Sequence, residues 1–140
     1  MPISKKLALR ILWPLLGAAV LVLFPFDWLG EVWPAYGQLF DIVFATALAH
    51  HIGHATIFFI AAVLILYAFP ALLARPLLYL LLLLLGALAE EALQSLFKLQ
   101  LPNWGDGRDL MYDFIGIVLA YAILRLWSWA RHKKPAPAKS

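Results

Sequence analysis

The sequence predicts an all-α, polytopic membrane protein: a bundle of about four transmembrane helices with both termini cytoplasmic. Three observations carry this prediction. Of the 140 residues, 64% are hydrophobic and only 14% are charged, and the mean hydropathy is +0.86. A soluble domain is about one quarter charged, whereas a membrane-spanning helix needs ~20 predominantly apolar residues. Four such helices with short connections would occupy most of the chain, which leaves no room for a separate soluble domain.

The first two expected spans differ in how clearly the sequence delimits them. The first, at about 7–29, follows a basic N-terminus as the apolar core of a signal peptide would. It lacks a small-residue cleavage site, so we expect it to be retained as a helix that Pro25 ends or kinks. The second covers about 42–69, which is longer than a straight span requires. We expect its polar beginning to tilt or to lie at the interface, so its upper boundary is open.

The last two spans and the tail complete a single transmembrane domain over 1–130. The third span, 76–97, is apolar on every face until Glu90, which indicates contact with lipid and neighbouring helices. The fourth is expected at about 109–129. The basic segment 131–140 is rich in Pro, Ala and Lys, so we expect a disordered cytoplasmic tail.

Lysine and arginine positions set the expected topology, because positively charged loops remain cytoplasmic. Only Lys98 and Arg108 fall outside the N-terminus, the second loop and the C-terminal part of the chain. We therefore expect a multi-pass protein of the inner (cytoplasmic) membrane with an N-in, C-in orientation. In that orientation the acidic residues gather at or near the outer half: Asp27, Glu31, Asp41, Glu90, Glu91, Asp106, Asp109 and Asp113. An outer aromatic belt of Trp28, Trp33, Tyr36 and Trp104 is expected beside them.

Ionisable side chains from three separate spans should meet in one shallow layer. Glu91 follows Pro76 by 15 residues, which places it ~22 Å into a hydrocarbon layer ~30 Å thick. Asp113 and His54 enter at a similar level on their own helices. An unpaired charge at mid-depth costs roughly 2.5–3.5 kcal/mol on insertion scales, so these groups should face inward and find partners. Gln94, three residues after Glu91, shares a face with it.

The beginning of the fourth span carries a stripe of short and acidic residues. Asp109, Asp113 and Gly116 fall on one face of the helix, where Gly116 permits the close approach of a neighbouring backbone. Arg108 offers a permanently charged, forked donor that can neutralise a carboxylate.

These residues resemble the VanZ-like family of small bacterial membrane proteins. The resemblance is carried by His54, by the segment 91–94 (EALQ) and by the segment 108–116 (RDLMYDFIG), and in element order it covers roughly residues 10–130. Asp113 stands where the family commonly has asparagine. The family's best-known member is associated with resistance to the glycopeptide teicoplanin. The resemblance implies functional positions at Glu91, Gln94, Arg108, Asp109 and Gly116.

The leading hypothesis is an outer-facing polar pocket that binds or acts on a lipid-linked or cell-envelope molecule. In it, Arg108 would hold an anionic group, Glu91 and Asp113 would polarise or take a proton, and His54 would relay that proton. Gln94 and Asp109 would also contact the substrate. The sequence decides neither the reaction nor whether there is one, because no complete catalytic motif is present.

Other interpretations remain open. The same polar residues can form a buried clasp that fixes helix register, and the chain can be a nonenzymatic accessory subunit of another membrane protein complex. A transporter would require a homo-oligomer to enclose a path. A metal site at His50, His51 and His54 is the weaker interpretation because their spacing matches no zinc motif, so no metal or cofactor is expected. Membrane lipid is an expected partner and nucleic acid is not.

Overall fold

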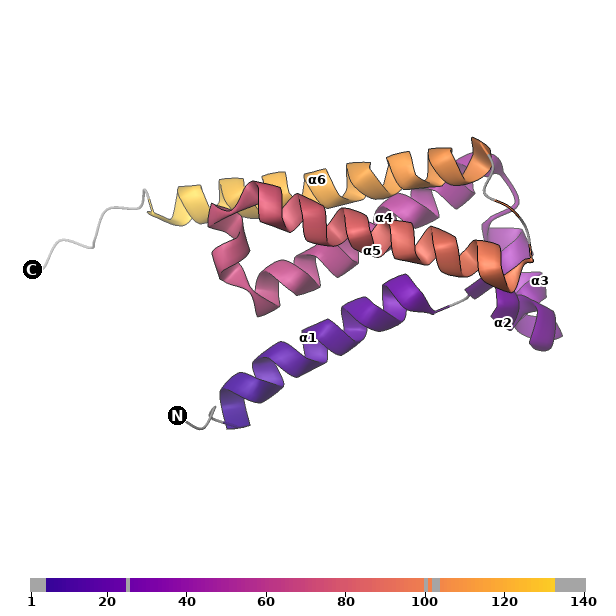
Figure 1. Ribbon diagram of the computed structural model, residues 1–140, viewed down its shortest axis with the longest axis horizontal. Helices are drawn as coiled ribbons and strands as arrows, with labels where there is room; N and C mark the ends of the chain where they lie inside the picture. The colour runs from indigo at the N-terminus through magenta and orange to yellow at the C-terminus, as the bar shows by residue number, and fades with distance from the viewer. Residues whose placement is uncertain (1–4, 25, 100, 102–103, 133–140) are drawn as a thin grey trace, which may run out of the picture.

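The computed structural model describes residues 5–24, 26–99, 101 and 104–132, and over these residues the chain is helical without strands. This confirms the predicted all-α class. Six α-helices and one short 3₁₀ helix follow one another in the described part: α1 Lys5–Leu23, α2 Phe26–Val32, α3 Pro34–Val43, α4 Ala47–Ala68, η1 Pro70–Ala74, α5 Pro76–Phe97 and α6 Trp104–His132 (Figure 1).

Three of the described helices are long and apolar enough to cross a membrane: α4, α5 and α6. The 22 residues of α4, like those of α5, rise ~33 Å, slightly more than the ~30 Å of a hydrocarbon core. Leucines of α5 remain highly exposed, including Leu77 at 81% and Leu81 at 56%, as expected of side chains that meet lipid. Length and exposed apolar surface together indicate a membrane protein. The fully described apolar stretch of α1, Ala8–Leu23, is shorter than these three.

Two expected spans are divided in the structure. The range 7–29 is not one helix, because α1 ends at Leu23 and a separate α2 begins at Phe26. The range 42–69 begins with the end of α3 and continues in α4, whose first turn is capped by Thr46: Ala49 N donates to its hydroxyl at 3.1 Å. A capping hydroxyl satisfies an otherwise unpaired helix donor and so favours a new helix start there. Within the expected tail, α6 continues through His132, and residues 133–140 lie outside the described part.

The closest packing in the bundle is between α4 and α6, which run side by side. A Cβ atom added to Gly116 would overlap the carbonyl oxygen of Ala55 on α4. This confirms the prediction that Gly116 permits a close neighbouring backbone. Next to this contact, the hydroxyl of the fully buried Tyr79 of α5 donates a hydrogen bond to the carbonyl oxygen of Ile117 at 2.7 Å. The three long helices are thus held at fixed separations around this core.

The described acidic side chains gather at one end of the bundle, here called the polar end. It comprises α2, α3, the beginning of α4, the end of α5 and the beginning of α6 (Figure 1, right). The start of α1 and the last turns of α6 lie at the opposite end. Helices α2 and α3, here called the cap, cross closely: Gly37 lies so near Gly30 that a Cβ would approach the Gly30 carbonyl oxygen at 2.6 Å. The cap therefore packs as a helical hairpin beside the polar residues.

Candidate functional site

The polar end contains a cluster of five residues from α4 and α6, here called the histidine–aspartate cluster: His50, His51, His54, Asp109 and Asp113. Two of its members are buried, His54 at 8% exposure and Asp113 at 0%. The histidines lie within the first two turns of α4, and the aspartates stand one turn apart on the face of α6 that Gly116 brings against α4. The close helix contact is therefore what allows short aspartates to reach the imidazoles.

Each aspartate holds a histidine through the ring nitrogen Nδ1. Nδ1 of His54 donates to Oδ1 of Asp113 at 3.0 Å, and Nδ1 of His51 donates to Oδ1 of Asp109 at 2.8 Å. His51 is further fixed by Tyr112, whose ring is stacked on it at a centroid distance of 4.5 Å. These bonds define which way the imidazoles face, since a ring held at one nitrogen presents the other.

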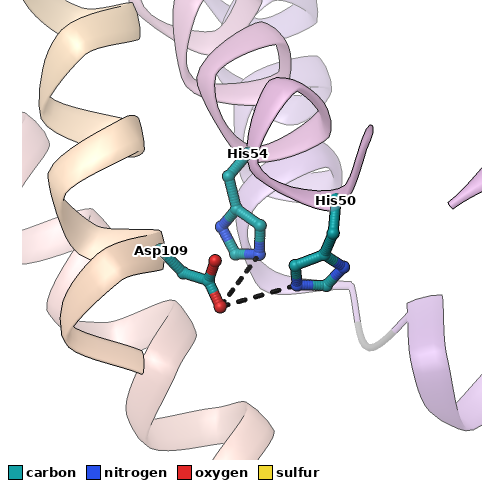
Figure 2. Close-up of side chains that lie close together, drawn as sticks. All are labelled: His50, His54 and Asp109. Atoms are coloured by element: carbon teal, nitrogen blue, oxygen red, sulfur yellow. Dashed lines mark ion pairs between the residues drawn. The ribbon is translucent and has the colours of Figure 1, made fainter. Parts of the chain in front are cut away.

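The second oxygen of Asp109 faces two histidines at once. Its Oδ2 lies 3.5 Å from Nε2 of His50 and 4.0 Å from Nε2 of His54. Figure 2 shows the three side chains pointing toward one another from α4 and α6. These separations exceed those of a normal hydrogen bond. The three atoms therefore converge at ion-pair distances and not at hydrogen-bond distances.

Helix α5 adds two carboxylates beside His54 and Asp113 of the cluster: Glu90 and Glu91. Gln94 donates to Oε1 of Glu90, and Lys98 donates to Oε1 of Gln94 at 3.1 Å. Three buried carboxylate oxygens have no hydrogen-bond partner among the described residues: Glu90 Oε2, Glu91 Oε1 and Asp113 Oδ2. Buried polar atoms are normally paired, so unpaired ones at a single location call for an explanation, such as a ligand or ion.

A cavity of about 310 Å³ adjoins the cluster beneath the cap. One part of its wall is polar, formed by His50, His54, Glu90, Gln94, Glu31 and Lys98. The rest is mainly aromatic and apolar, with contributions from the cap, α4, α5 and the residues that directly follow α1 and α3: Phe24, Phe26, Trp28, Tyr36, Phe40, Phe44, Gly53, Ile57, Phe58 and Phe97. The cavity is thus amphipathic, and the imidazoles of His50 and His54 form part of its polar wall.

The expected catalytic residues come together as the sequence suggested. One ligand-type atom each of His54, Glu91 and Asp113, together with Glu90, lie within 4.8 Å of one another. Among the expected substrate-binding residues, Gln94 lines the cavity and Asp109 joins the histidines.

Arg108 is the exception among the expected site residues. It is exposed, and within the described part of the chain it forms no ion pair with any of these carboxylates. The side chains that contact Asp109 and Asp113 are histidines instead.

Several residues of the site were not among the expected catalytic or substrate-binding residues, although His50 and His51 belonged to the weaker metal-site interpretation. Glu90 lines the cavity, and His50 and His51 both contact Asp109. The spacing of His50 and His54, one helical turn apart, was a signal for this arrangement. The cap residues Trp28 and Tyr36 were expected to serve only as a membrane belt, and they also line the cavity.

A scan against family profiles, a search of characterised proteins and a search of solved structures each found no match to this chain. The geometry of the site is therefore what indicates a function for the protein. That geometry offers a preformed amphipathic cavity, histidines oriented by carboxylates, and two groups of side chains close enough to share one cation: His50, His54 and Asp109, and His54, Glu90, Glu91 and Asp113.

Proposed function

We propose that the protein binds an amphiphilic molecule of the cell envelope, with the polar group of that molecule at the histidine–aspartate cluster and its apolar part against the aromatic wall. The observation that carries the proposal is the divided lining of the cavity. Ligand sites are usually largely apolar with a few placed polar groups, and they are largely formed before the ligand arrives. A cavity with its polar wall at the end of membrane-spanning helices matches a lipid-linked molecule better than a fully water-soluble one.

The membrane arrangement that goes with this proposal has four spans. Helix α1 would be the fourth, with both termini cytoplasmic and the polar end facing outward from the inner membrane. The distribution of lysine and arginine along the chain supports that orientation. An outward polar end would give the cavity access to molecules of the outer leaflet.

Specific roles follow for residues on the cavity wall. His54 would exchange a proton with the polar group of the ligand, because Asp113 fixes its ring and it lines the cavity. Glu90 would accept hydrogen bonds from hydroxyl or amide groups of the ligand, and Gln94 would donate hydrogen bonds to such groups or accept them. Glu91 and Asp109 would set the local charge. The resemblance to the VanZ-like family extends this proposal to a part in glycopeptide resistance, including resistance to teicoplanin.

A matched pair of tryptophan variants tests amphiphile binding. Ile57→Trp places a large side chain in the cavity, whereas Ile60→Trp adds the same side chain at an exposed position of the same helix. The measurement is native mass spectrometry of the full chain released from detergent, which detects molecules retained from the host membrane. We expect the unaltered protein and Ile60→Trp to retain an amphiphile and Ile57→Trp to lose it.

Equal retention by both variants would refute the cavity as the binding site. A stoichiometric protein partner, with no retained amphiphile in any variant, would favour the accessory-subunit alternative. A host that lacks the protein gives the physiological readout: the glycopeptide phenotype should return with Ile60→Trp and fail to return with Ile57→Trp.

A further inference from the structure

We infer that His50, His54 and Asp109 form a binding site for a divalent transition-metal ion of the Zn²⁺ class. The first support is the position of three ligand-type atoms: Nε2 of His50, Nε2 of His54 and Oδ2 of Asp109. The aspartate oxygen lies 3.5 Å and 4.0 Å from the two nitrogens, and one ligand-type atom of each residue lies within 4.8 Å of those of the other two. In a tetrahedral zinc site with bonds of 2.0–2.2 Å, neighbouring ligand atoms are about 3.3 Å apart.

The second support is the set of hydrogen bonds behind these atoms. Asp113 accepts a hydrogen bond from Nδ1 of His54, which leaves the lone pair of a neutral imidazole on Nε2, the nitrogen that faces Asp109. Such a carboxylate behind a histidine is the usual outer support of a zinc ligand. His51 likewise donates to Oδ1 of Asp109 and leaves Oδ2 directed at the other two histidines. The hydrogen bonds thus orient both residues as ligands.

The third support is electrostatic. With His54 neutral and no cation bound, a lone pair on its Nε2 faces the negative Oδ2 of Asp109, while buried oxygens of Glu90 and Glu91 stand unpaired nearby. Asp113, fully buried, also has its Oδ2 unpaired among the described residues. Burying several carboxylates in a region of low dielectric constant is unfavourable unless positive charge compensates them. A divalent ion bound by His54 would supply that charge beside these carboxylates, because His54 belongs to both groups of potential ligands.

The ligand set also selects the type of metal. Two imidazoles and one carboxylate suit Zn²⁺ and neighbouring transition metals, whereas Mg²⁺ and Ca²⁺ prefer oxygen ligands throughout. Three protein ligands with a further position for water or substrate are typical of catalytic rather than structural zinc sites. His50 and His54 both line the cavity, so the remaining position faces it. Resting on the proposed function, the ion would take the place of the proton on His54 and polarise a phosphoryl or carbonyl oxygen of the bound amphiphile.

Metal binding by the purified full-length protein tests the site. The protein, stripped with a chelator in mild detergent, is titrated with Zn²⁺ against a chromophoric competitor, and bound metal is counted by elemental mass spectrometry. We expect one Zn²⁺ per chain, not displaced by excess Mg²⁺ or Ca²⁺. His50→Ala and Asp109→Asn should each weaken binding more than the ~10–100-fold expected for an outer-shell change such as Asp113→Asn. Binding should be unchanged by His132→Ala and Asp41→Asn, which remove the same groups elsewhere in the chain.

Unaltered helicity by circular dichroism will separate loss of ligand from loss of fold. Substitution of Co²⁺ gives a visible absorption that reports four-coordinate geometry directly in the unaltered protein. The inference is overturned when the unaltered protein binds less than one ion per chain, or when His50→Ala and Asp109→Asn bind like it. It is also overturned when only Glu90→Gln and Glu91→Gln reduce binding, since that result moves the ion to α5.

This experiment is independent of amphiphile binding because the protein is stripped of metal and titrated without added lipid. Ile57→Trp should lose the amphiphile and keep Zn²⁺, whereas His50→Ala should bind Zn²⁺ more weakly by a factor larger than ~10–100. Failure of one proposal is therefore distinguishable from failure of the other.

Discussion

Replacing Gly116 with alanine tests the contact that brings the aspartates to the histidines. A Cβ at Gly116 would overlap the carbonyl oxygen of Ala55 and lie 3.0 Å from both the carbonyl carbon of Ala55 and the amide nitrogen of Phe59. All three are backbone atoms, which cannot rotate aside, so α4 and α6 must separate. Overpacking of this kind typically destabilises by ~1–3 kcal/mol. The separation should also weaken the hydrogen bond between His54 and Asp113, and with it any Zn²⁺ binding.

The same helix offers a matched control at Gly107, where a Cβ would meet nothing within 4 Å. Gly107→Ala should therefore be neutral or stabilising by up to ~1 kcal/mol, because alanine favours the helix. The assay is the free energy of unfolding in mixed micelles, followed by tryptophan fluorescence and circular dichroism as a denaturing detergent is added. We expect Gly116→Ala to lower the free energy of unfolding and Gly107→Ala to leave it unchanged or to raise it. Equal or stabilising effects of both substitutions would refute the close contact between α4 and α6.

Three further predictions concern the core, the charge of the site and the topology. Tyr79→Phe removes the buried hydrogen bond to Ile117 and should lower the free energy of unfolding by about 0.6 kcal/mol, and by no more than ~1.7, in the same micelle assay. Glu91→Gln removes a carboxylate that has a buried unpaired oxygen, so the free energy of unfolding should be unchanged or higher by up to ~1–3 kcal/mol. Amphiphile retention should fall. A large loss of stability would contradict this prediction. Because the chain contains no cysteine, Leu101→Cys should react with an impermeant maleimide on intact cells, and Ala74→Cys only after permeabilisation; the reverse pattern would invert the topology.

The convergence of polar groups was predictable from sequence because the membrane restricts the alternatives. An ionisable side chain within an apolar span must face the bundle or the interface. His54, Glu91 and Asp113 each have a depth that follows from residue number and helix rise, so their meeting in one layer needed no detailed structure. The role of Gly116 followed in the same way from its position on the stripe of Asp109 and Asp113.

The position of Arg108 could not be read from its proximity to Asp109. Successive residues of an α-helix are rotated by about 100°, so a residue next to an inward-facing aspartate points elsewhere. Asp109 faces α4, and Arg108 is correspondingly exposed. Histidines on the facing helix occupy the place beside the aspartates that was expected for arginine, which only the pairing of α4 with α6 reveals.

The cap was not predictable from the apolar pattern. The first expected span, 7–29, includes the beginning of α2, and the second, 42–69, includes the end of α3, while residues 30–41 lie between the two expected spans. What separates them is local: Pro34 begins α3, Thr46 caps α4, and Gly30 lets α2 cross α3 closely. The aromatic residues of the cap suit a membrane interface as well as a cavity wall. Sequence therefore identified the polar side of the site but not the side formed by the cap.

X-ray absorption at the zinc edge of the zinc-loaded full-length protein tests the central claim most directly. The claim is that histidines of α4 and an aspartate of α6 bind one metal ion beside the cavity. We predict nitrogen and oxygen neighbours at ~2.0–2.2 Å, with the outer-shell scattering of two imidazoles that His50→Ala reduces to one. A shell of oxygen atoms alone, or a spectrum that His50→Ala leaves unchanged, would contradict this account of the site.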